Sequence, residues 1–161
     1  MSTLDFVQSK VDYDYSGLDD AFPAVDPGHT PFGEFVILQV RSAKEKTKGG
    51  IHLPETVRAT DQDNTQVAKV IAIGPGAFRS RRDGAEWPEG AWYKVGDYVR
   101  CPKYGGDRWT IRTERKVEEK QVGSLVLAGG VESVEANFVL LKDLDVRAKI
   151  TADPRSIRSF L

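Results

Sequence analysis

Short apolar runs separated by glycine and proline dominate the middle of the chain. Residues 34–41, EFVILQVR, form an apolar run rich in β-branched and aromatic side chains that is too short to predict a helix. Residues 67–76, VAKVIAIGPG, alternate between apolar and polar positions and stop at Gly-Pro-Gly. Both segments therefore predict strands, and the second strand is expected to end in a turn.

The segments that follow also predict strands joined by tight turns. Asp83-Gly84, at the centre of residues 77–97, is typical of a hairpin tip. Two Gly-Gly pairs predict further turns, Gly105-Gly106 between two short strands in 97–113 and Gly129-Gly130 at the tip of a hairpin in 124–134. Residues 137–150 predict an apolar strand and a final strand.

The charged run ERKVEEKQ, residues 114–121, fits either a solvated hairpin arm or a short exposed helix. No long helix is predicted elsewhere, and no repeat is visible in the sequence. Many short strands with glycine and proline turns predict an all-β fold, either a barrel or a sandwich. A chain of 161 residues is long enough for one such domain to fold without disulfides or metals.

The first thirty residues differ in charge from the rest. They contain six aspartates and one lysine, which gives −5, whereas the whole chain carries −1 and residues 31–161 therefore carry +4. Such a balance predicts an acidic N-terminal extension, residues 1–30, that is partly disordered by itself. Its apolar residues are candidates to dock on the domain: Phe6, Val7, Val11, Tyr13, Tyr15, Leu18 and Phe22.

Few residues are suited to catalysis or metal binding. The chain has two histidines, His29 and His52, and one cysteine, Cys101, whereas a structural zinc site normally uses four such ligands. No G-x-S-x-G nucleophile elbow occurs, and GPGAFRSRRDG lacks the Gly-Lys-Ser/Thr ending of a phosphate-binding loop. Cys101 is best interpreted as a small core residue. We therefore predict no enzyme activity, no metal and no cofactor bound by this chain.

The composition also bears on location. The N-terminus has no basic start followed by an apolar run, and no apolar stretch is long enough to cross a bilayer. A single cysteine suits a reducing compartment. We therefore expect a cytoplasmic protein without a membrane partner.

Aromatic and arginine residues between positions 79 and 109 allow two interpretations. On a monomeric β-barrel they would form a stacking platform for nucleic acid. They would otherwise belong to the barrel core and to hairpin packing, which the near-zero net charge favours. The residues in question are Arg79, Arg81, Arg82, Trp87, Trp92, Tyr93, Tyr98, Tyr104 and Trp109.

Residues 45–56, EKTKGGIHLPET, place two apolar side chains in a polar, glycine-rich segment. Ile51 and Leu53 would point the same way on an extended strand. Gly49-Gly50 gives the free segment high entropy, and Pro54 ends any strand. The pattern fits a loop that becomes extended only on a partner, although a strand buried in the protein's own core would fit it equally well.

The order of the motifs resembles that of the GroES-type co-chaperonins over roughly residues 31–150. GGIHLPE is similar to the family's Gly-Gly-Ile-hydrophobic-Leu mobile loop, and VIAIGPG to the strand before its roof hairpin. KVGDYV, KYGG and FVLLKDLDVRAKI are similar to its Val-Gly-Asp turn, its Lys-Tyr turn and its C-terminal strand pair. The resemblance implies a small β-barrel protomer in a heptameric ring that caps an ATP-driven GroEL-type chaperonin around an unfolded client protein.

The resemblance also implies where the functional residues are. The mobile loop would be about 42–66, with Gly49, Gly50, Ile51, His52 and Leu53 binding an apolar groove of the chaperonin, which itself binds the ATP. The roof hairpin would be about 77–92, with Arg79, Arg81, Arg82, Asp83 and Gly84 meeting other copies near the ring axis. Those arginines would repel unless Asp83, Glu86 and Glu89 lie between them.

Some features depart from the family pattern. His52 stands where the family usually has valine or a similar residue. The N-terminal extension, an enlarged segment at about 112–136 and the tail at 151–161 exceed the family's usual length. Such elaboration is typical of a divergent copy, and a phage-encoded protein that acts in its host's cytoplasm is one interpretation.

Overall fold

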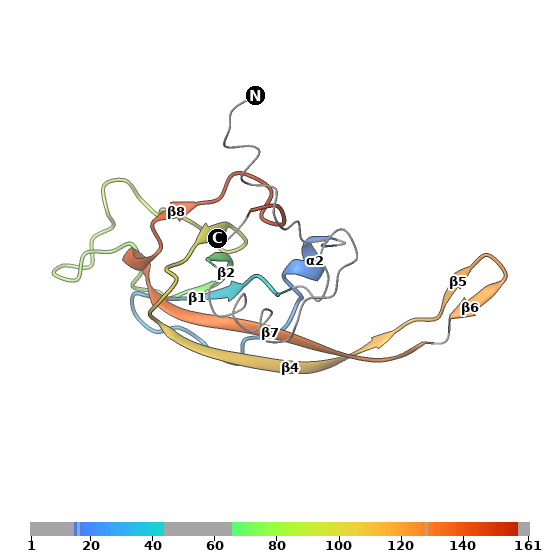
Figure 1. The fold of residues 1–161 in the computed structure, drawn as a ribbon. Coiled ribbons are helices and arrows are strands. Elements are labelled where there is room, and N and C mark those ends of the chain that lie inside the picture. The colour runs from blue at the N-terminus through green and yellow to red at the C-terminus, as the bar shows by residue number, and fades with distance from the viewer. Residues whose placement is uncertain (1–14, 16, 44–65, 128, 158–161) are drawn as a thin grey trace, which may run out of the picture.

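The computed structural model describes residues 15, 17–43, 66–127 and 129–157. Within these ranges the chain forms a six-stranded antiparallel sheet in the order β4-β7-β1-β2-β3-β8 and a two-stranded β5–β6 ribbon (Figure 1). The fold is therefore all-β, as predicted, and it is consistent with the small β-barrel that the sequence resemblance implies. The strands are β1 (Phe35–Val40), β2 (Val67–Ile73), β3 (Tyr98–Arg100), β4 (Asp107–Val117), β5 (Lys120–Val122), β6 (Leu125–Leu127), β7 (Gly130–Lys142) and β8 (Ala148–Lys149). A short helix, α2 (Leu18–Ala21), and a 3₁₀ turn, η1 (Asp143–Asp145), complete the described elements.

Strand β1 is buried on both faces, which explains why EFVILQVR is apolar almost throughout. Val36, Leu38 and Val40 face the main core with residues of β2, β3 and β7. On the opposite face Ile37 packs with Ala136 and Phe138 of β7. The predicted strands at 34–41 and 67–76 are thus confirmed as β1 and β2.

An N-terminal strap, residues 17–31, covers that second face of the sheet. Gln39 is 2% exposed and donates from Nε2 to the carbonyl oxygen of Pro23 at 2.7 Å. Further along, the Trp109 indole donates to the carbonyl oxygen of Pro27 at 2.9 Å, and the His29 ring lies 4.3 Å from the Trp109 ring. This described part of the acidic extension is packed on the sheet.

Strands β4 and β7 extend beyond the rest of the sheet as a two-stranded β-arm, residues 110–137 (Figure 1). The last β1–β7 pair is Val40 with Asn137, so the residues of β7 before Asn137 have no β1 partner. The register from Asp107↔Leu140 to Val117↔Gly130 continues unchanged into Lys120↔Leu127 in β5–β6. The β-arm is therefore a single long hairpin.

The structure bears on two of the predicted turns, those at Gly129-Gly130 and Gly105-Gly106. The β-arm turns at Gly123-Ser124, between paired Val122 and Leu125, so the predicted hairpin tip at Gly129-Gly130 is wrong. Gly123 adopts φ +62°, which suits glycine in a two-residue turn. Gly105-Gly106 does lie between two strands, but β3 and β4 are not neighbours in the sheet.

The described ranges contain neither a helix suited to cross a membrane nor a cluster of metal-binding side chains. None of the helices found there is long and apolar enough to cross a membrane. Those same residues contain no group of three or more histidine, cysteine or carboxylate side chains able to hold a metal ion.

Candidate functional site

The segment predicted to be the mobile loop starts and ends at one end of the sheet, which we call the loop root, residues 41–43 and 66–67. The Arg41 amide donates to the Val67 carbonyl oxygen at 2.9 Å, which joins the two sides of the root. The Cys101 amide donates to the Gln66 carbonyl oxygen at 2.8 Å. Backbone hydrogen bonds therefore fix both ends of the intervening segment next to each other.

The strap and Tyr15, which precedes it, contact the loop root through hydrogen bonds to Ser42. The Ser42 amide donates to the Ala21 carbonyl oxygen at 2.9 Å, and the Tyr15 hydroxyl donates to the Ser42 carbonyl oxygen at 2.5 Å. Tyr15 and Ala21 belong to a buried cluster with Phe22 and Val67. The described part of the acidic extension thus packs directly on the base of the predicted loop.

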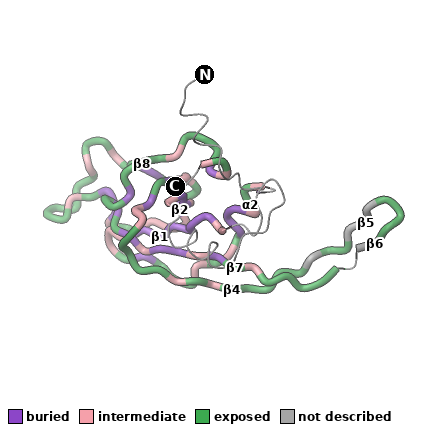
Figure 2. The backbone as a smooth tube through the Cα atoms, in the orientation of Figure 1, coloured by how far each residue is buried: buried purple, intermediate pink, exposed green. Residues whose placement is uncertain are grey.

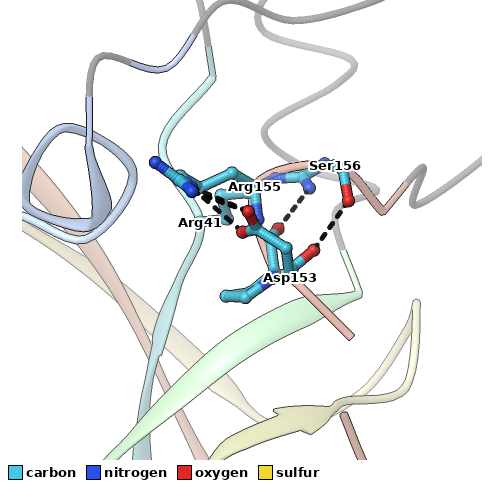
Figure 3. A network of polar contacts seen from close by, with 5 residues as sticks. Arg41, Asp153, Arg155 and Ser156 are labelled. Carbon is cyan, nitrogen blue, oxygen red and sulfur yellow. Dashed lines mark hydrogen bonds and ion pairs between the residues drawn. The ribbon is translucent and has the colours of Figure 1, made fainter. Parts of the chain in front are cut away.

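Arg41 ties the tail to the same place (Figure 3). Its side chain is 1% exposed, and Nη1 donates to the carbonyl oxygens of Pro154, at 2.9 Å, and of Ile157. The Arg41 guanidinium also lies 5.5 Å from the centre of the Tyr15 ring, a cation–π contact. Within the tail, hydrogen bonds from Arg155 lower the pKa of the Asp153 carboxyl to about 2, which keeps that turn ion-paired.

The five residues predicted to bind the chaperonin, Gly49, Gly50, Ile51, His52 and Leu53, lie outside the described residues. Their roles, and the alternative that Ile51 and Leu53 belong to the protein's own core, stay sequence predictions. The structure instead describes the residues that flank this segment, 41–43 and 66–67.

The predicted roof segment contains a short hairpin at the opposite end of the sheet. Arg79 and Glu86 form an antiparallel bridge, and the Ser80 amide donates to the Ala85 carbonyl oxygen at 2.8 Å. Gly84 adopts φ +71° at the tip, and the Asp83 carboxylate accepts from the Ala85 amide. That backbone hydrogen bond lowers the pKa of Asp83.

Two of the three hairpin arginines are paired within the protomer. Arg79 lies 3.2 Å from Glu86, and Arg81 makes a two-pronged contact with Glu34, with both nitrogen–oxygen distances at 2.9 Å. Glu89 accepts a hydrogen bond from the Trp92 indole instead. These acidic groups therefore already offset part of the positive charge that would otherwise meet between copies.

Sequence reasoning missed the residue that fixes the base of this hairpin. Asp143 is 2% exposed, and its carboxylate accepts from the amides of Phe78, at 2.9 Å, and Leu144, at 2.8 Å. Phe78 has φ +58°, a strained value for a residue with a side chain. The Tyr93 hydroxyl donates to the Asp143 carbonyl oxygen at 3.0 Å, and burial raises the pKa of Tyr93. The signal in the sequence was an aspartate two positions after the apolar run FVLL, residues 138–141.

The aromatic residues between 87 and 109 do not gather on one surface. Tyr93 is in the core, in edge-on contact with Phe78, and Trp87 packs against it from outside. Tyr98 packs against Phe22 of the strap at a ring separation of 5.2 Å. Trp109 lies under the strap, whereas Tyr104 is 77% exposed in its turn. A single stacking platform for nucleic acid is therefore not formed by these described residues.

Cys101 lies in the main core at 1% exposure, and burial raises the pKa of its thiol. The interpretation of Cys101 as a structural residue is consistent with this position.

Comparison with known protein families identifies the family of this chain. The family model described as chaperonin 10 Kd subunit matches residues 29–150. The chain belongs to this family of co-chaperonins. The match spans the sheet, the roof segment and the β-arm of this co-chaperonin, and it ends just before the tail at 151–161. Membership supports a co-chaperonin role, with a GroEL-type chaperonin as partner and assembly of several copies, and the family is not one of enzymes.

Proposed function

We propose that a heptameric ring of this co-chaperonin caps a GroEL-type chaperonin and helps to enclose an unfolded client protein. Gly49 to Leu53 would bind the chaperonin, and the chaperonin would bind and hydrolyse the ATP that drives folding. The proposal places the protein in the cytoplasm, which is the host's cytoplasm if the protein is phage-encoded. The observation that carries the proposal is the family match over residues 29–150.

The arrangement of the barrel supports this division of roles. Val40, at the end of β1, pairs with Ala68, whereas Val36 near its start pairs with Ile73 at the end of β2. The loop root follows the first of these pairs, and the hairpin at 79–86 follows the second. The residues that flank the predicted mobile loop and the hairpin at 79–86 therefore lie at opposite ends of the barrel, an arrangement that suits a cap if one end binds the partner and the other closes the chamber.

The expected energetics suit a cap that must also leave. Full burial of Ile51 or Leu53 would contribute about 1.5–3 kcal/mol per side chain. Ordering the loop costs about 1–2 kcal/mol for each residue that becomes fixed, so one loop binds weakly. Several tethered loops on one ring convert weak contacts into useful avidity, provided they engage together.

We expect the double substitution Ile51→Ser, Leu53→Ser to abolish capture by a GroEL-type chaperonin. Loss of both apolar side chains from every loop should weaken capture by at least about a hundredfold, which corresponds to about 3 kcal/mol. The measurement is co-elution of the purified protein with the chaperonin in ATP or ADP. Native mass spectrometry of the protein alone should show a ring near seven times 17.8 kDa.

The matched control is Val95→Ser, Leu144→Ser, which makes the same kind of change at side chains that are 60% and 55% exposed. This control should be captured like the original protein. Undiminished capture of the Ile51→Ser, Leu53→Ser variant would move the contact to another surface. A monomeric mass with no capture of the unaltered protein would contradict the proposed function itself.

His52 should make capture depend on pH. If binding buries the imidazole in its neutral form, its pKa falls below the ordinary value of about 6.5. Affinity is then full above the free-state pKa and declines as the pH falls through it, because the proton must leave before binding. Capture at about pH 7.5 and about pH 5.5 should therefore differ more for the original protein than for His52→Val. Identical pH responses would mean that His52 faces solvent in the complex.

A further inference from the structure

The described side chains of the β-arm form no core of their own beyond the barrel. Residues 112–116, 129–133 and 135 are exposed, and only Val134 among these neighbours is partly covered (Figure 2). Cross-strand ion pairs, Arg112 with Glu135 and Arg115 with Glu132, link the two strands. Exposed pairs of this kind contribute about 0–1 kcal/mol each, and an isolated two-stranded ribbon is marginal in water. Contact with the surface of another molecule would therefore stabilise a β-arm with this regular pairing.

The direction of the β-arm identifies which surface it reaches. Strand β7 runs antiparallel to β1, and the unpaired part of β7 continues past Val40, the last residue of β1. The loop root begins at the next residue, so the β-arm and the predicted mobile loop leave from the same end of the barrel. Six residue steps from Val117 to Gly123 add roughly 20 Å of reach beyond β4. The roof hairpin is at the other end (Figure 1).

The chemistry of the β-arm fits a protein surface. Residues 112–135 contain four cationic and five anionic side chains, so the β-arm carries only −1 and has no attraction for nucleic acid or an anionic membrane. Leu125 and Val131 are 69% and 64% exposed. They are six residues apart in one continuous register, so strand alternation puts them on one face of the hairpin.

We propose that the β-arm is a second docking element for the chaperonin, which contacts the chaperonin's surface beside the site that receives the 44–65 segment. This inference rests on the proposed function. In the proposed complex a neighbouring copy would lie beside the barrel, whereas the chaperonin would lie beyond the loop root, in the direction in which the β-arm points. The contact would add to the affinity of each protomer and would be multiplied by the number of protomers in the ring.

The decisive variant shortens the β-arm. Residues 114–133 are replaced by Asn-Gly, so that the paired residues Thr113 and Val134 are joined by a two-residue turn. The register of the strand pairs within the barrel is unchanged. We expect the ring to form with its mass reduced only by the deleted residues, and capture by the GroEL-type chaperonin in ADP to weaken at least about tenfold.

A point substitution tests the same contact without a deletion. Val131→Ser should weaken capture about threefold or more, because the lost contact recurs in every protomer. The control is Val95→Ser, which removes the same side chain at a similar exposure, 60%, from a loop outside the β-arm. It should leave capture unchanged. If the shortened variant fails to fold, as judged by its circular dichroism, this pair of variants decides the question.

The outcomes separate the two proposals. If the unaltered ring is captured and the loop substitutions abolish capture, but the shortened variant and Val131→Ser are captured like the original, the β-arm proposal is overturned and the capping function stands. If the shortened variant folds but no longer forms a ring, the β-arm binds a neighbouring copy and the proposal is also overturned. If the unaltered protein is not captured at all, the proposed function fails first.

Discussion

Replacing Gly74 by alanine is expected to destabilise the folded protomer by about 3 kcal/mol or more. A Cβ atom at this position would meet the carbonyl oxygen of Gly33 in severe overlap and that of Phe35 at 2.7 Å. Both obstacles are backbone atoms, so no side chain can rotate away to make room. Core overpacking commonly costs about 1–3 kcal/mol, and backbone overlap lies at the upper end or beyond it.

The backbone around Gly74 also has little freedom to move. The Gly74 amide donates to the Phe35 carbonyl oxygen at 2.8 Å, and the Gly76 amide donates to that of Gly33 at 2.8 Å. These two bonds fasten the turn after β2 to the start of β1. A shift that admitted the methyl group would break them and would displace the hairpin that follows.

Urea unfolding at a fixed protomer concentration measures the effect, because assembly makes apparent stability depend on concentration. The control is Gly130→Ala, where a Cβ would meet nothing within 4 Å and the backbone has no positive φ. That change should be neutral or slightly stabilising. A Gly74→Ala protein as stable as Gly130→Ala would show that the start of β1 can give way, contrary to the packing described here.

The strands around the core could be predicted because each has a local signature. β1 is an apolar run and β2 is an alternating run that ends at Gly-Pro-Gly, and burial on one or both faces is the reason for those patterns. The turn at Asp83-Gly84 could be predicted because its positive φ suits glycine, and Asp83 stabilises the turn through its own carboxylate.

The turn position and the length of the β-arm could not be predicted, because its described residues beyond the barrel have no buried face that would impose an alternation of apolar and polar positions. Gly129-Gly130 and Gly123-Ser124 both suit a turn, and the choice between them depends on pairing across a distance. Only the second turn lets Arg112 meet Glu135 and Arg115 meet Glu132 in one register. The charged run at 114–121 was correctly allowed to be a hairpin arm, but its length depends on those pairs.

Docking of Tyr15 and Phe22 on the domain was expected from the sequence, but the polar contacts of the strap and of the loop root were not, for a different reason. Gln39 and Arg41 are polar residues at the end of an apolar strand, which usually indicates exposure. Here their side chains are buried because they donate to backbone carbonyl oxygens of Pro23 and Pro154. Such hydrogen bonds depend on how segments that are distant in the sequence pack together. The residues around Pro23 and Pro154 do not indicate which side chain will donate to their carbonyl oxygens.

The second large effect is expected at Phe22, the residue that fastens the strap to the loop root. Phe22 is 3% exposed and packs in one cluster with Tyr15, Ala21 and Val67. Its ring also lies 5.2 Å from that of Tyr98. Phe22→Ala should lower the free energy of unfolding by about 3–4 kcal/mol, since deleting a buried phenylalanine ring loses its transfer free energy and leaves a cavity.

The same substitution should loosen the base of the predicted loop more than the rest of the sheet. Ala21, next to Phe22, accepts the Ser42 amide, so loss of the ring removes packing that holds this hydrogen bond. Native-state hydrogen exchange should therefore become faster at the amide of Ser42 than at the amides of β7, whose partners lie within the sheet. This readout separates local release of the strap from general destabilisation.

Phe32→Ala is the matched control, because it removes the same ring from a residue ten positions away that is 82% exposed. An exposed substitution of this kind usually changes stability by no more than about 0.5 kcal/mol. If Phe22→Ala and Phe32→Ala unfold at the same urea concentration and leave Ser42 equally protected, the strap does not support the loop root. If only Phe22→Ala speeds exchange at Ser42, the acidic extension contributes to the stability of the loop root, which flanks the segment predicted to bind the chaperonin.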